Sequence, residues 1–169
     1  MAASSLTLVN QKLAYCRALM KLVQSESVPK RADDRLRRQA LLDAGAFHLL
    51  CAYRHYLREL AEHHTVADTS RILTEQDLLQ ALDRLGKTSF EARELQALSE
   101  DAQSWLSGLH NAYHSFWQPP VAESLQRIEV VDLDSPAGAA RQVSRENLEA
   151  WYRAFNDLVE RQRETSAEY

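Results

Sequence analysis

The chain has 169 residues, of which 45% are hydrophobic and 26% charged, with only four Gly and four Pro. This composition is typical of a soluble globular protein of one domain, residues 1–169, and so few turn residues favour helices over a β-sandwich or barrel. The net charge of −4 argues against nucleic acid as a partner, because nucleic-acid-binding domains usually carry clustered Lys and Arg.

The two cysteines, Cys16 and Cys51, lie far apart in the chain and form no CxxC spacing. A disulfide scaffold and a zinc ribbon are therefore excluded, and we expect both thiols to pack in the core. The first residues lack the basic stretch and apolar core of a signal peptide, and no apolar run reaches the length of a membrane span. We expect a cytoplasmic protein that does not enter a membrane.

The first two helices are predicted from apolar residues spaced three and four apart, over residues 5–24 and 32–64. The second has two apolar stripes. Phe47 and Leu49 lie about 200° apart around the axis, so these stripes face nearly opposite sides. Such a helix is central to a bundle, or it covers the core on one side and a dimer partner on the other. One stripe contains Ala40, Ala44, Phe47 and Cys51, and the other Leu42, Ala46, Leu49, Tyr53, Tyr56 or Leu57, and Leu60.

Three shorter helices are predicted in the middle of the chain. The first begins at Thr74, which has Asp77 three residues later, and the second begins at Thr88, which would form a capping box with Glu91. The third lies within residues 101–117 and stops at two consecutive prolines, which cannot continue a helix.

The last part of the chain combines an irregular segment with one more helix. Residues 121–143 contain β-branched residues without a partner strand, so they are predicted as an extended arm or loop. Ser144 is the predicted N-cap of the last helix, and residues 164–169 are predicted as a polar tail. The chain is thus predicted to be all-α: a single-domain bundle of five or six helices with a long central second helix and one extended arm.

Arg58 is followed by His63 or His64 at the spacing that marks the HEPN domains, a family of helical ribonucleases. Arginine can hold a phosphate, and a histidine near its ordinary pKa can move the proton of a 2′-hydroxyl. The spacing is short, however, and is expected by chance in a chain with this many Arg and His. The favoured interpretation is the polar end of an amphipathic helix, and the nuclease remains an alternative.

His110 and His114 are four residues apart, so both rings can lie on one face of a helix and bind one metal ion. A metal site needs further ligands, and the Glu-x-x-His signature of di-iron bundles is absent. A surface pair is the favoured interpretation, with a metal or small-ligand site as an alternative. No cofactor is predicted.

Aromatic residues are the remaining candidates for function, because they are enriched at protein interfaces. The most economical function is a non-catalytic one: protein–protein interaction, as a homodimer or with another protein. The candidate contact residues are Tyr53, Tyr56, Trp117, Trp151 and Tyr152.

Three stretches together resemble a known family: TLVNQKLAYCRAL, FHLLCAYRHYLRELAEH and ELQALSEDAQSWLSGLHNAY. The family comprises small all-helical proteins of unknown function from pseudomonads and related gammaproteobacteria. The resemblance runs from about Thr7 to the closing RETSAEY and is carried by Asn10–Leu13, Tyr53 and Ser104–Leu106. It implies a helical fold and a bacterial cytosol, and it implies no activity.

Overall fold

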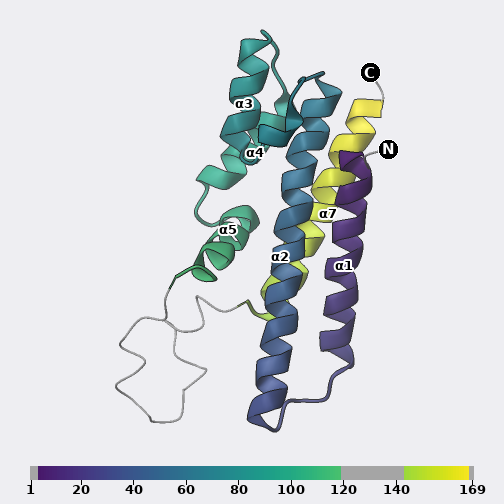
Figure 1. The fold of residues 1–169 in the computed structure, drawn as a ribbon, viewed down its shortest axis with the longest axis vertical. Coiled ribbons are helices and arrows are strands. Elements are labelled where there is room, and N and C mark those ends of the chain that lie inside the picture. The colour runs from purple at the N-terminus through teal and green to yellow at the C-terminus, as the bar shows by residue number, and fades with distance from the viewer. Residues whose placement is uncertain (1–3, 119–142, 168–169) are drawn as a thin grey trace.

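The computed structural model describes residues 4–118 and 143–167, which contain six α-helices and no β-strand (Figure 1). This confirms the prediction of an all-α bundle with a long second helix. The long helices are α1 (Ser5–Ser25), α2 (Ala32–His63) and α7 (Arg145–Ala167). The shorter elements are the 3₁₀ helix η1 (Thr69–Arg71), α3 (Glu75–Arg84), α4 (Phe90–Glu100) and α5 (Trp105–Ser115).

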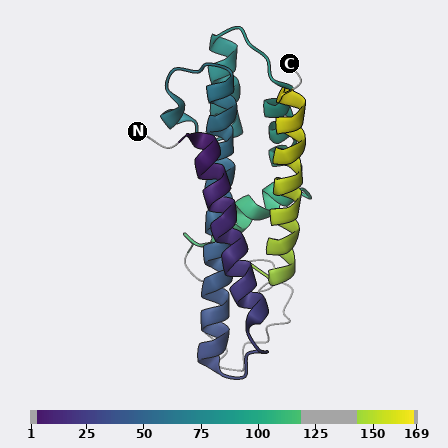
Figure 2. The same ribbon diagram turned by 90° about the vertical axis from the view of Figure 1, so that its right-hand side faces the viewer.

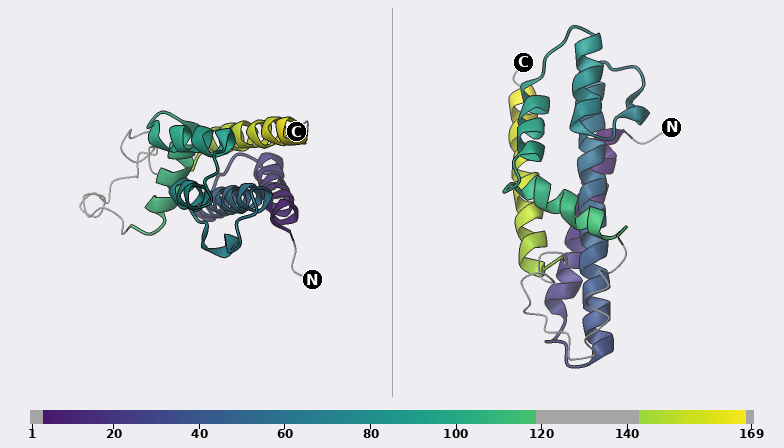
Figure 3. Two further views of the ribbon diagram at one scale, coloured as in Figure 1. Left: turned by 90° about the horizontal axis from the view of Figure 1, so that it is seen from above. Right: turned by 90° about the vertical axis from the view of Figure 1, so that its left-hand side faces the viewer.

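The three long helices lie side by side, with α1 antiparallel to α2 and α7 parallel to α2 (Figures 1 and 2). The start of α1 and the end of α7 therefore lie at the same end of the bundle. Helices α3 and α4 also lie at this end, and α5 crosses the long axis beside α2 and α7 (Figure 3). Since α2 contacts each of the other described elements, its predicted central place is confirmed.

The core forms where one stripe of α2 meets α1, α5 and α7. Within it, Leu49, Leu57 and Phe155 are fully buried. A Cβ atom on Gly45 would lie 2.7 Å from Cδ2 of Leu148, so this glycine lets α7 approach α2 closely. The predicted inner stripe of α2 is buried throughout: Leu42, Ala46, Leu49, Tyr53, Tyr56, Leu57 and Leu60.

The predicted ends of α1 and α2 lie within one residue of those observed. Helix α3 has the predicted capping box between Thr74 and Asp77. The predicted cap of α4 is wrong by one residue: Ser89, not Thr88, accepts the backbone N–H of Ala92. Ser144 accepts the N–H of Asn147 at 3.0 Å, as expected for the cap of the last helix.

The structure describes most of the predicted tail but almost none of the predicted arm. Helix α7 continues to Ala167, so residues 164–167 are helical and not a tail. The predicted arm at 121–143 lies outside the described residues except for Val143, which is buried and accepts a hydrogen bond from Gln39 through its carbonyl. Among the described helices, none is long and apolar enough to cross a membrane.

Candidate functional site

Tyr53 and Tyr56 were predicted to contribute to a contact surface, but the structure buries both side chains to 1% exposure. The Tyr53 hydroxyl donates to the carboxylate of Glu75, and the Tyr56 hydroxyl donates to the Gln162 side chain at 2.6 Å. Burial raises the pKa of both tyrosines, and the nearby Glu75 raises that of Tyr53 further. The two rings are thus part of the core and offer no surface to a partner.

The hydroxyl of Tyr56 belongs to a polar network that joins three helices. The Gln162 amide donates to Glu94 of α4 at 2.7 Å, and Arg161 donates to the same carboxylate at 2.5 and 3.3 Å. The next residue of α7, Arg163, forms two 2.7 Å hydrogen bonds with Glu59 of α2. These charged groups form hydrogen bonds with one another across neighbouring helices, so their role is to stabilise the fold.

Arg58, the candidate phosphate-binding residue, is engaged with the loop that follows α2. Its Nε donates to the carbonyl of Ile72 at 3.2 Å and its Nη2 to the carbonyl of Ser70 at 3.3 Å. His63 is exposed and its ring contacts that of His64. The guanidinium therefore holds the loop around η1 against α2, which gives Arg58 a role in the fold.

His110, the first candidate metal ligand, lies half-buried on α5 with its ring edge-on to Tyr53, centroids 5.7 Å apart. Burial lowers its pKa, while Glu75 acts in the opposite direction. His114 is exposed at the end of the same helix. In residues 4–118 and 143–167, no three His, Cys, Asp or Glu side chains are grouped to hold a metal ion, so this pair lacks further protein ligands there.

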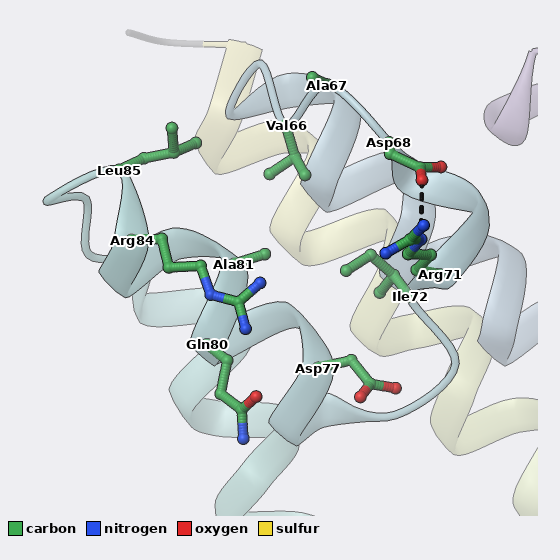
Figure 4. Close-up of a pocket in the computed structure, with 10 residues that line it drawn as sticks. All are labelled: Val66, Ala67, Asp68, Arg71, Ile72, Asp77, Gln80, Ala81, Arg84 and Leu85. Atoms are coloured by element: carbon green, nitrogen blue, oxygen red, sulfur yellow. Dashed lines mark ion pairs between the residues drawn. The ribbon is translucent and has the colours of Figure 1, made fainter.

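A surface hollow of about 460 Å³ lies between α3 and the loop around η1 (Figure 4). Its volume falls in the range of small-ligand pockets, but its acidic groups are already engaged. Asp68 pairs with Arg71 at 3.0 Å, and Asp77 accepts the N–H groups of Leu73 and Thr74. These contacts organise the loop and the start of α3, so the polar side chains left to face a ligand are those of Gln80 and Arg84 (Figure 4).

A second hollow, of about 320 Å³, lies between α1 and α7 and contains Tyr152. Tyr152 is half-buried, and charged residues of both signs, among them Arg17 and Asp157, surround it. Trp151 faces α5 and is also half-buried, with its ring 3.1 Å from where a Cβ atom on Gly108 would lie. Of the predicted contact residues, Trp117 is the most exposed, at 73%.

Trp117 belongs to a series of aromatic rings in contact across α1, α2 and the end of α5. We call this series the aromatic band. Phe47 of α2 stacks on Tyr113 of α5 with centroids 6.4 Å apart, and Tyr113 in turn contacts Trp117 at 6.0 Å. The full band consists of Tyr15, Phe47, His48, Tyr113, Phe116 and Trp117.

The aromatic band is partly open to solvent, since His48 and Tyr113 are half-buried and the other four rings are exposed, and cations lie at its edge. Tyr15 is 44% exposed and Phe47 44%, whereas a large apolar side chain gains stability from burial. Lys12 lies 5.6 Å from the centre of the Tyr15 ring, and the guanidinium of Arg54 lies 5.3 Å from the Tyr113 ring. Such cation–π contacts are favourable and fix the direction of the rings.

The band continues into the second apolar stripe of α2, which we call the outer stripe and which contains Leu36, Ala40, Ala44, Phe47 and Cys51. Leu36 is 73% exposed, Ala40 is exposed, and Cys51 is half-buried rather than part of the core. Cys16, in contrast, is fully buried, which raises its pKa to about 12. The two faces predicted for this helix are thus one buried face and one open face.

The prediction of contact residues missed Tyr15, Phe47, Tyr113 and Phe116. Phe47 lies on the stripe of α2 opposite the core stripe, and this position could have indicated that its ring is exposed. The place of Tyr113 depends on how α5 crosses α2, which no local pattern specifies. Aromatic side chains at a protein surface are suited to bind another protein surface, and the band brings together no nucleophile, acid and base in an arrangement for catalysis.

Comparison with known proteins supplies a family for this chain and no activity. No curated protein and no solved structure matches it. A family model described as a family of unknown function, DUF6586, matches residues 1–169. The chain therefore belongs to this family of unknown function.

Proposed function

We propose that this protein acts by protein–protein contact, without catalysis, and that its contact surface is the outer stripe of α2 together with the aromatic band. The observation that carries the proposal is the contact of the half-buried Tyr113 ring with the exposed rings of Phe47 and Trp117. We expect the protein to act in the bacterial cytoplasm.

The energetics of the surface support this proposal. Contiguous exposed apolar patches are uncommon on monomeric proteins and mark sites of association. Aromatic residues at the centre of an interface contribute a large share of the binding free energy, since they bury much area at a small cost in conformational entropy. The adjacent cations Lys12 and Arg54 would form the polar edge that surrounds such a centre.

The proposal is tested by one substitution and a matched control. Phe47→Glu places a charge in the middle of the surface, and Phe90→Glu places the same charge on α4, where the native ring is 76% exposed. Tagged protein is used to capture partners from lysate of the native host to which a second, differently tagged copy has been added.

We expect wild type and Phe90→Glu to retain the same partner, either the second copy or another protein, and Phe47→Glu to lose it. Circular dichroism confirms that each variant is folded. Retention of the same partner by all three proteins would show that this surface is not the contact site.

A further inference from the structure

We propose that the partner on the outer stripe is a second copy of this chain, packed so that the two α2 helices run antiparallel. The two-fold axis passes between Asp43 and Ala44 of each helix. This inference rests on the proposed function and names the partner that the surface binds.

The outer stripe is straight enough to receive another helix. At 100° per residue, Leu36 and Phe47 lie within about 20° of each other around the α2 axis, and Ala40 lies within about 40° of Leu36. Cys51 and Ala44 lie about 60° and 80° from Leu36, so the whole stripe falls within about 80°. The face extends along about 30 Å of helix. Figure 2 shows α2 at an edge of the bundle, where the loop around η1 and the end of α5 project beyond it.

The sizes of the side chains match under this symmetry. The axis places Phe47 of one copy opposite Ala40 of the other, so that a large ring meets a methyl group at two equivalent places. It also places Leu36 opposite Cys51. Small residues at 40 and 44 allow the two backbones to approach to the ordinary distance of packed helices, about 8–10 Å.

The charges match as well. The same axis places Asp33 of one copy opposite Arg54 of the other, again twice. Within residues 4–118 and 143–167, neither of them forms an ion pair with another side chain. Asp33 is exposed, and Arg54 is half-buried with its guanidinium 5.3 Å from the centre of the Tyr113 ring.

Asp43 lies beside the axis, where two like charges would oppose association. Its carboxylate accepts a 2.8 Å hydrogen bond from Gln39, whose amide also donates to the carbonyl of Val143 at the start of α7. These contacts hold the Asp43 carboxylate beside Gln39, on the side of α2 that lies nearest Val143. In a two-fold contact each pair occurs twice, so matched size and matched charge together favour a second copy over an unrelated protein.

A cysteine cross-link tests the register. Leu36→Cys places a thiol opposite the natural Cys51 of the other copy. Within one α2 helix these positions are about 22 Å apart, far beyond the reach of a disulfide, so any bond between them joins two chains. We expect mild oxidation to convert most of this variant into a covalent dimer on a non-reducing gel.

Two controls accompany the cross-link. Leu22→Cys, on α1 at a residue that is 52% exposed, should stay monomeric on the gel. The double variant Leu36→Cys/Cys51→Ser should also stay monomeric, because the two copies of residue 36 lie far apart in the antiparallel register. A cross-link that survives Cys51→Ser would overturn the register.

Sedimentation equilibrium separates the failure of this inference from that of the proposed function. A dimer that dissociates with Phe47→Glu but does not cross-link through residue 36 would overturn the register and leave the contact surface in place. A monomer whose other partner is lost with Phe47→Glu would overturn the second copy alone. A protein with no partner that depends on Phe47 would overturn both.

Charge reversal gives a second readout of the same register. Asp33→Arg and Arg54→Glu each create two like-charge contacts, and we expect each to raise the dimer Kd about tenfold. The double variant restores opposite charges and should recover a large part of this loss. Additive losses in the double variant would contradict the pairing.

Discussion

The sequence pattern predicts which face of α2 carries Tyr53 and Tyr56, but it does not predict whether that face is buried. Their spacing puts both on the inner stripe of α2, which is correct. Whether such a ring ends in the core or at a surface depends on a polar partner for its hydroxyl, here Glu75 of α3 and Gln162 of α7. These partners come from distant parts of the chain, so no local pattern identifies them.

The hydrogen bond of Tyr53 makes a testable contribution to stability. We expect Tyr53→Phe to lower the free energy of unfolding by about 1–3 kcal/mol, because the Glu75 carboxylate would remain buried without its donor. The measurement is urea denaturation followed by circular dichroism. Tyr152→Phe is the matched control: this half-buried hydroxyl has no hydrogen bond among the described residues, so we expect a change below about 0.5 kcal/mol. Equal effects of the two variants would contradict the account.

Four histidines predict how stability depends on pH. Burial is the main cause of the lowered pKa of His48, His55, His64 and His110. A lowered pKa in the folded state means that the unfolded chain binds protons more readily below the ordinary value of 6.5, so stability falls as the pH falls below it. The carboxylates with lowered pKa, such as Glu94 with an ordinary value of 4.5, act at lower pH.

We therefore expect a lower melting temperature at about pH 5.5 than at about pH 7.5. Calorimetry at the two pH values measures the difference. His110→Gln should reduce it, whereas His63→Gln, at an exposed residue far along α2, should keep most of it. A melting temperature that rises toward the lower pH would contradict the burial of these rings.

At the scale of the elements, the sequence predicted the helices well and their ends unevenly. The bounds of α1 and α2 follow from apolar periodicity, which is strong in long helices. The start of α4 was misassigned because Thr88 and Ser89 are both good caps. The structure favours Ser89, which is buried, accepts from Ala92 and donates to Glu91 at 2.7 Å. Likewise, the polar residues after 163 suggested a tail, although α7 continues to Ala167.

The cap of α4 can be tested by alanine at either position. We expect Ser89→Ala to destabilise the protein by about 1 kcal/mol, within the range of about 0.5–2 kcal/mol for lost N-caps. Thr88→Ala removes an exposed side chain and should change stability by less than about 0.5 kcal/mol. Chemical denaturation of the two variants decides between them, and a larger loss for Thr88→Ala would restore the capping box first predicted from the sequence.

At the scale of the whole molecule, the two-sided α2 helix connects fold to proposed function. The two stripes were predictable, since Phe47 and Leu49 lie on opposite sides of one helix. Periodicity could not say which stripe stays open, because that depends on where α5 and α7 pack. Nor could it join Phe47 to Tyr113, which lie on different helices and meet only in the folded chain.

The proposed nuclease site and the proposed metal site could be assessed only once the fold was known. Arg58 and His63 matched a nuclease spacing, but the guanidinium holds the loop around η1. His110 and His114 share α5, yet His110 is half-buried with its ring against Tyr53, whereas His114 is exposed. Short motifs report only local spacing, whereas the use of each group depends on contacts with other helices.

The central claim is that the open face of α2 binds a partner, and that this partner is a second copy of the chain. Sedimentation equilibrium of the wild-type protein over a range of concentrations tests it most directly. We expect a reversible dimer of twice the 19.3 kDa chain mass, and a monomer for Phe47→Glu under the same conditions. A wild-type protein that stays at 19.3 kDa at every concentration would contradict the second copy as partner.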